Sequence, residues 1–229
     1  MELQGGCGMT NDVADRVLRL KDALETVESI NNRLNELPKI FVVLLTVAVA
    51  TLGAYDVLWL MLGTVYPQLS FMWGLVVLVL ILFTLLYTAR RLDKAAEVKG
   101  PYQDWGDKLK EGALGVLAIL ESLDWDYVEY RVNRARSLYP ILLIVDEALW
   151  TALLLVFFVV PAYTFLNAFL FNPTGNPWYV LVGSVALAVA ITLAITWGEV
   201  VDTFRTLWSL DSLLWEVRWL YHEYRKLQT

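Results

Sequence analysis

The sequence has few charged residues, a single cysteine and a single histidine, and each shortage excludes a class of protein. Charged residues make up 18% of the 229 residues and hydrophobic residues 58%, whereas soluble domains carry about 25% charged and about 45–50% apolar residues. This composition excludes a disordered chain and a typical soluble enzyme. Cys7 cannot form an internal disulfide, and His222 alone cannot build a histidine metal site or a histidine-containing triad within one chain.

Motifs of enzymes and of nucleic-acid-binding proteins are also missing. The sequence has no glycine-rich phosphate loop and no Gly-x-Ser-x-Gly nucleophile elbow. Its formal net charge of −6 lacks the basic footprint that phosphate binding needs. We therefore expect no enzymatic activity and no catalytic residue, no bound metal or cofactor, and no nucleic-acid partner.

Hydrophobic residues gather instead in four long runs. A helix needs roughly 20 apolar residues to cross the hydrocarbon core of a membrane, and each run is long enough or nearly so. The runs cover residues 40–63, 71–89, 141–171 and 178–197. The sequence therefore predicts an all-α polytopic membrane protein with four transmembrane helices, arranged as two hairpins.

The distribution of basic residues predicts the orientation of these hairpins. All 18 lysines and arginines lie before the first run, between the second and third runs, or after the fourth. Because basic residues accumulate on the cytoplasmic side, both termini and the central region are expected there, in the cell (plasma) membrane. The expected segments are an N-terminal helix (1–37), a first hairpin (38–92), a central helical segment (93–137), a second hairpin (138–198) and a C-terminal helix (199–229).

The three cytoplasmic segments carry apolar residues at helical spacing. From Val13 to Leu34 the apolar positions alternate steps of four and three, and Leu24 and Asn31 fall in this series. Such a heptad pattern is typical of coiled coils, in which a buried Asn fixes register and oligomer state. Asn31 is therefore either a determinant of self-association or a residue that faces water at a helix end. A similar pattern after residue 207 includes Leu214, and Trp219 adds an aromatic anchor for an interface.

The order of the segments indicates an internal duplication. Each half reads as helix, span, span and helix, and short fragments of the halves are alike: residues 20–24 resemble 109–114, and residues 32–38 resemble 133–140. Both halves have the same predicted topology, so the repeat is parallel, with its axis along the membrane normal. No glycine or proline follows Gly198, and one helix is therefore expected to run from Trp178 to about Leu227.

Acidic residues in or near the spans are the candidates for function. Asp56 lies in the first span, roughly 10 Å below its outer end, where an ionised carboxylate costs several kcal/mol unless it is paired, hydrated or protonated. Its alternatives are water, a bound cation, a proton, a second copy of the chain, or a neutral role in hydrogen bonds between helices. No lysine, arginine or histidine lies in any span to pair with it.

Asp146 and Glu147 begin the third span and admit two interpretations. Both can lie at the inner interface, near Arg134 and Arg136. Alternatively they form a cation vestibule together with Glu199 and Asp202 at the inner end of the fourth span, because a ring of acids concentrates cations.

These features leave three hypotheses for function. The first is a homo-oligomeric, cation-preferring ion channel or pore, which passes an inorganic cation by way of Asp56, Asp146, Glu147, Glu199 and Asp202. The second is a non-enzymatic membrane scaffold or membrane-shaping protein that acts through its cytoplasmic helices. The third is a small transporter of a solute or an ion. The lipid bilayer is a partner in all three.

Overall fold

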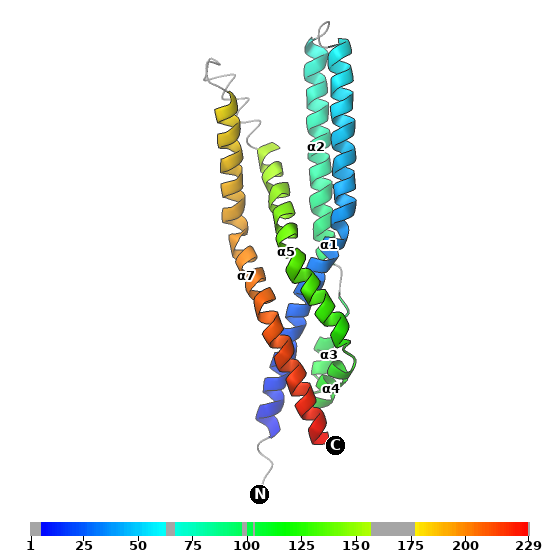
Figure 1. The fold of residues 1–229 in the computed structure, drawn as a ribbon, viewed down its shortest axis with the longest axis vertical. Coiled ribbons are helices and arrows are strands. Elements are labelled where there is room, and N and C mark those ends of the chain that lie inside the picture. Colours follow the sequence, from blue (N-terminus) through cyan, green and yellow to red (C-terminus); the bar gives the residue numbers. More distant parts are fainter. Residues whose placement is uncertain (1–5, 63–66, 98–99, 103, 157–176, 229) are drawn as a thin grey trace. The chain divides into compact units, whose positions relative to one another are not determined.

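A computed structural model describes residues 6–62, 67–97, 100–102, 104–156 and 177–228. The side chains of residues 6–12, 52, 55–62, 67–75, 177–184, 224, 227 and 228 lie outside the described part. Within these ranges the chain is helical and contains no strand (Figure 1). The helices are α1 (Gly6–Leu62), α2 (Pro67–Ala96), α3 (Trp105–Leu109), α4 (Ala113–Glu121), α5 (Trp125–Leu154) and α7 (Pro177–Gln228).

The long helices continue where the sequence predicted boundaries. α1 joins the expected N-terminal helix to the first run through Pro38, and α5 joins the central segment to the third run through Pro140. A proline inside a helix removes one backbone hydrogen bond, but the flanking residues keep theirs, and the helix persists. α7 is unbroken over 52 residues, which confirms the single long helix predicted from residue 178 onward.

Between α2 and α5 the chain forms the two short helices α3 and α4. Gly112 separates α3 from α4 and has φ of +74°, a conformation that glycine adopts without steric cost. Gly115 is buried, and a methyl group added to it would overlap the carbonyl oxygen of Lys108. These two glycines allow a tight helical hairpin of α3 and α4.

The chain divides into two compact units, each of which takes parts of several helices. The first unit holds Met1–Asn32, Ala96–Pro140 and Gly198–Thr229. Its core is mostly apolar and is built from the predicted heptad positions of α1 and α7, one face of α5 and a side chain of α4. The largest fully buried apolar side chains of this unit are Val17, Leu20, Leu24, Val27, Ile119, Val132, Leu207, Leu210 and Val217.

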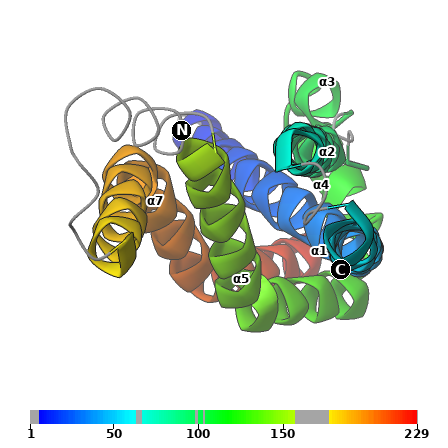
Figure 2. The ribbon, with the colours of Figure 1, turned by 90° about the horizontal axis from the view of Figure 1, so that it is seen from above.

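The second unit holds Arg33–Ala95 and Ile141–Trp197. In it α1 and α2 lie side by side as an antiparallel pair, which both views of the ribbon display (Figures 1 and 2). α2 also packs against α5, where Ala89, Leu149 and Leu153 are buried together. Hydrogen bonds connect α5 to α7.

Large apolar side chains of the second unit face outward. Phe41 is 66% exposed, Phe83 67% and Ile195 73%, which is unusual for a soluble protein but expected where lipid replaces water. Three helical stretches of the described residues are long and apolar enough to cross a membrane: Val13–Thr51, Trp125–Leu154 and Val185–Glu223. The helical fold is therefore compatible with a membrane protein.

Candidate cation site

Four oxygen-bearing side chains of α5 and α7 meet in the second unit. Glu147 and Thr151 are four residues apart on α5, and Thr192 and Thr196 are four residues apart on α7. Residues at i and i+4 share one face of an α-helix, so each helix presents two oxygen-bearing groups to the other. We call these four residues the Glu147 cluster.

In each hydrogen bond of the cluster, the donor and the acceptor can be assigned. The hydroxyl of Thr196 donates to Oε1 of Glu147. The hydroxyl of Thr151 donates to Oγ1 of Thr192 at 3.3 Å, and that of Thr192 donates to the carbonyl oxygen of Ala188 at 2.9 Å. This assignment is forced, because a carbonyl oxygen only accepts and a hydroxyl has one proton to give.

The other carboxylate oxygen of Glu147, Oε2, is buried and has no hydrogen-bond partner in the described part of the chain. Glu147 and Thr151 also line a cavity of about 320 Å³. The other lining side chains are apolar: Ala148, Ala152, Leu155, Val189 and Leu193. A buried acceptor without a donor costs about 1–3 kcal/mol, and more when it is charged. The cluster thus contains a buried, unsatisfied oxygen, and Glu147 and Thr151 border open space with other atoms.

Asp146 belongs to a separate ionic group, although it precedes Glu147. Its Oδ2 lies 3.8 Å from Nη1 of Arg33 on α1, and Nη2 of Arg33 lies 4.0 Å from Oδ1 of Asp93 on α2. Nothing in the sequence singled out Arg33 as a neighbour of Asp146. Arg136, one of the two expected neighbours, pairs with Asp211 on α7.

None of the other predicted acids belongs to the Glu147 cluster. Glu199 and Asp202 are exposed and belong to the first unit, whereas Glu147 and Asp146 belong to the second. Asp56 lies in α1, but its side chain is outside the described residues. The vestibule of four acids and the role of Asp56 stay predictions.

Asn31 and Leu24 are covered by the chain itself. Leu24 is 1% exposed and Asn31 is fully buried, so Asn31 does not face water. Nδ2 of Asn31 donates to the carbonyl oxygen of Arg131 on α5 at 3.0 Å. Arg131 in turn forms an ion pair of 2.5 Å with Glu28. Their part in self-association stays a prediction, while in this structure both side chains pack within one chain.

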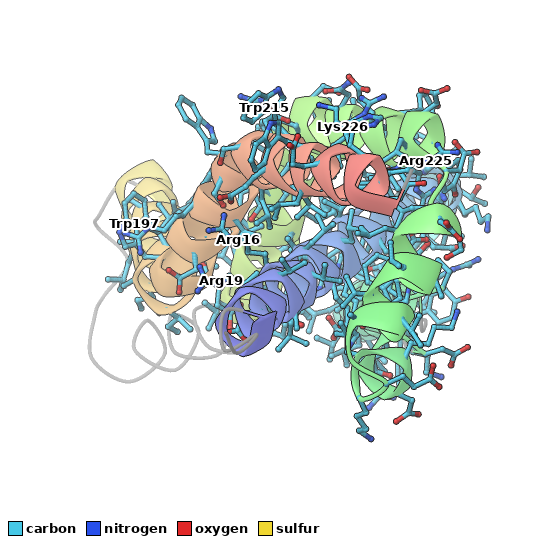
Figure 3. The ribbon with its side chains drawn as sticks, turned by 90° about the horizontal axis from the view of Figure 1, so that it is seen from below. Arg16, Arg19, Trp197, Trp215, Arg225 and Lys226 are labelled. Carbon is cyan, nitrogen blue, oxygen red and sulfur yellow. The ribbon has the colours of Figure 1, made fainter. Side chains whose placement is uncertain are left out.

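The outer face of α7 in the first unit carries three exposed tryptophans. Trp208, Trp215 and Trp219 are 72%, 71% and 51% exposed, and Trp215 points away from the bundle in Figure 3. Leu214 is partly buried and lines a groove of about 280 Å³ with Trp125 and Trp215. We call Trp208, Trp215 and Trp219 the tryptophan stripe.

Burial also changes the acidity of one side chain in the first unit. Tyr102 is 7% exposed and packs edge-to-face on Trp105, with the ring centroids 5.1 Å apart. Loss of hydration, and secondarily the nearby carboxylate of Glu28, raise the pKa of Tyr102 to about 12.

The described residues contain no group of three His, Cys, Asp or Glu side chains arranged to hold a metal ion. Comparisons with protein families, with curated proteins and with solved structures find no match.

Sequence reasoning found Glu147 but did not connect it to the threonines that surround it. The spans contain many threonines, and most of them donate to a carbonyl of their own helix, as Thr46 and Thr84 do. A usable signal existed: the four-residue spacing of Glu147 and Thr151 matches that of Thr192 and Thr196. The spacing identifies two polar faces, but only the fold brings them together.

Proposed function

We propose that this chain is a multi-pass membrane protein that forms a cation-preferring pathway past Glu147, as a homo-oligomeric channel. In this proposal four helices span the plasma membrane as two hairpins related by a parallel duplication, and both termini lie in the cytoplasm. The chain carries out no enzymatic reaction. The lipid bilayer and an inorganic cation are its partners.

The observation that carries the proposal is the shortage of donors around Glu147. Thr196 has a single hydroxyl proton but two acceptors in reach, Oε1 of Glu147 and the carbonyl oxygen of Thr192 at 3.0 Å. Oε2 has no donor among the residues that the structure describes. An ionised carboxylate in this setting is stabilised by a cation or by water, and intramembrane acids of this kind mark ion pathways.

The threonine geometry supports transient rather than permanent binding. When the Thr196 proton turns to the carbonyl of Thr192, Oγ1 of Thr196 keeps its lone pairs beside Glu147. When no cation is bound, the Thr196 hydroxyl can thus donate a hydrogen bond to the carboxylate of Glu147. When a cation is bound, the hydroxyl oxygen can coordinate it together with that carboxylate. Conduction needs binding that is strong enough for entry and weak enough for release.

The test is cation flux into proteoliposomes that contain the purified full chain. Glu147→Gln keeps the shape of the side chain and removes its charge, and Glu121→Gln makes the same change at an exposed position of α4. We expect Glu147→Gln to lower Na⁺ or K⁺ flux by about tenfold or more, which corresponds to about 1.4 kcal/mol. Glu121→Gln should leave it unchanged. Equal flux in both variants would contradict the pathway, and saturating flux would favour the transporter.

The tryptophan stripe favours a second candidate, a membrane scaffold. Exposed tryptophans are typical anchors of protein interfaces, and Trp208, Trp215 and Trp219 lie on one helix with no described residue covering most of their surface. In this case Trp215→Ala abolishes the function of the protein while Glu147→Gln preserves it. The flux experiment therefore separates the two candidates.

A further inference from the structure

One face of α2 in the second unit carries a row of exposed side chains that changes from apolar to basic along the helix. Positions 76, 80, 83, 87, 90 and 94 alternate steps of four and three, which keeps them on one face of an α-helix. All six side chains are exposed. In chain order they are Val76, Leu80, Phe83, Tyr87, Arg90 and Lys94. We call these six residues the α2 row.

The apolar part of the α2 row has the length of one membrane leaflet. From Val76 to Tyr87 the helix rises by roughly 16 Å, at about 1.5 Å per residue. One leaflet supplies half of a hydrocarbon core that is about 30 Å thick. Within this length Leu80 is 46% exposed and Phe83 is 67% exposed. These side chains can therefore lie along the acyl chain of a lipid, with Tyr87 at the interface, where tyrosine is enriched.

The basic end of the α2 row lacks acidic partners. The second unit has five lysines and arginines. Three of them form ion pairs with carboxylates: Arg33, Lys39 and Arg91. Arg90 and Lys94 are exposed and form no ion pair with any residue that the structure describes. Their charges are therefore available to an anion from outside the chain.

Tyr87 adds a hydrogen-bond donor beside the two cations. Its hydroxyl oxygen accepts a hydrogen bond from Nη1 of Arg91 at 3.2 Å, and no described residue accepts the hydroxyl proton. Side chains of a helix lean toward its N-terminus, so Arg90 and Lys94 lean toward Tyr87. Two cations and a phenol proton together suit a phosphate group, because charged donors form strong hydrogen bonds with phosphate oxygens.

We propose that the α2 row binds one anionic phospholipid of the cytoplasmic leaflet. The phosphate lies on Arg90, Lys94 and Tyr87, and an acyl chain lies along Phe83 and Leu80. This inference rests on the proposed function, since it takes α2 as a membrane-spanning helix whose C-terminal end is cytoplasmic. A zwitterionic lipid fits less well, because the cation of its headgroup finds no carboxylate on the row.

α1 of the same unit provides a contrast with the α2 row. Its side chains Val42, Leu45 and Val49 are also exposed and apolar, at 61%, 53% and 63%. The nearest basic residue on α1 is Lys39, and its Nζ lies 2.6 Å from Oε1 of Glu36. An acyl chain can therefore contact either helix, whereas only α2 follows its apolar side chains with unpaired cations.

The experiment is photolabelling of the full chain in phosphatidylcholine proteoliposomes. The probes are phosphatidylglycerol and phosphatidylcholine, which carry the same diazirine at the same carbon of one acyl chain. Mass spectrometry of the labelled peptides gives the ratio of phosphatidylglycerol to phosphatidylcholine labelling. This ratio is measured for residues 76–94 of α2 and, as an internal control, for residues 42–49 of α1.

Three double variants test the basic end of the row. Arg90→Gln with Lys94→Gln removes both charges. Arg90→Lys with Lys94→Arg exchanges the two residues and keeps the charges. Arg225→Gln with Lys226→Gln removes one arginine and one lysine from exposed positions of the first unit, which Figure 3 labels, and thus matches the first variant in net charge.

We expect the labelling ratio to be about fivefold or more higher on residues 76–94 than on residues 42–49, because each basic side chain near the surface adds a several-fold attraction to anionic lipid. Arg90→Gln with Lys94→Gln should abolish this difference, and the other two double variants should keep it. Equal ratios on both segments, or an equal fall in the Arg225→Gln and Lys226→Gln variant, would overturn the proposal. Loss of the difference in excess inorganic phosphate, but not in KCl of the same ionic strength, would also overturn it, since the site would then take a free anion.

Failure of this inference differs from failure of the proposed function. Cation flux that depends on Glu147, with equal labelling ratios on the two segments, overturns the lipid site and keeps the pathway. Selective labelling of residues 76–94 without any cation flux supports the lipid site and overturns the pathway.

Discussion

Replacement of Asn31 by leucine should make the protein more stable, although it removes a buried polar contact between helices. Asn31 is fully buried between α1 and α5. Its Nδ2 donates to the carbonyl oxygens of Val27 and Arg131, at 2.9 and 3.0 Å. Its Oδ1 is buried and has no hydrogen-bond partner in the described ranges of the chain.

The magnitude follows from opposing contributions. Loss of the two bonds to Val27 and Arg131 costs about 1–3 kcal/mol in total, whereas removal of an unsatisfied buried acceptor gains about 1–3 kcal/mol. The additional apolar carbon that leucine buries gains about 0.8 kcal/mol more. Both carbonyl oxygens lie inside helices and keep the backbone as their other donor, so neither is orphaned by the change. The net expectation is a gain of about 1 kcal/mol, or roughly 2–4 °C in the unfolding midpoint for a chain of this size.

Two further variants make the reasoning testable. Asn31→Asp replaces the donating Nδ2 by an oxygen, which faces the carbonyl oxygens of Val27 and Arg131 and cannot donate to them. This variant should destabilise the protein by about 3 kcal/mol or more. Asn133→Leu alters an exposed asparagine of α5 and should change stability by less than about 0.5 kcal/mol.

The assay is thermal unfolding of the full chain in nanodiscs, followed by tryptophan fluorescence at one fixed scan rate, because membrane proteins often unfold irreversibly. The predicted order of midpoints is Asn31→Leu above the wild type, with Asn31→Asp well below. A midpoint for Asn31→Leu that falls as far as that of Asn31→Asp would refute the reasoning, and would mean that Oδ1 has a partner after all.

Two more predictions concern the α3–α4 hairpin and its neighbour Tyr102. Gly115→Ala should destabilise the protein by about 1–3 kcal/mol through overlap with Lys108, whereas Gly106→Ala, with open space around it, should not; equal unfolding midpoints would contradict this. The pKa of Tyr102 is raised above its usual 10.0 to about 12, so the folded state keeps this proton longer than the unfolded state. Stability should therefore decline between about pH 10 and pH 12, and less so in Tyr102→Phe; identical pH profiles would sink the assignment.

Helices were the most predictable part of the fold. The absence of glycine and proline after Gly198 predicted the full length of α7, and the heptad positions Val17, Leu20 and Leu24 are buried as their spacing indicates. Periodicity reports which face of a helix is apolar, and that face is buried regardless of which neighbour covers it.

The ends of helices, and their continuation through proline, were harder to predict, because both depend on contacts beyond the local sequence. Pro38 and Pro140 stay inside helices, although proline is a common terminator. Conversely, the helical spacing of the central segment did not indicate the break at Gly112. A helix tolerates one missing hydrogen bond when packing holds its flanks, and a spacing pattern cannot report a positive φ.

The candidate site was predictable only in part for a similar reason. An acid within an apolar run attracts attention, so Glu147 was found, but its partner Thr196 is 49 residues away. Asn31 likewise fitted a coiled-coil pattern between chains, yet its partner Arg131 belongs to the same chain, 100 residues along. Spacing identifies a polar face, whereas the identity of its neighbour is a property of the fold.

The most direct test of the central claim is a high-resolution single-particle structure of the full chain in nanodiscs, with a cation present. The claim is that Oε2 of Glu147 faces a site that a cation or a water molecule fills. We predict density within hydrogen-bonding distance of Oε2, in a cavity shared by α5 and α7. A cavity closed by apolar side chains or filled by a lipid tail, with no density at Oε2, would contradict the account.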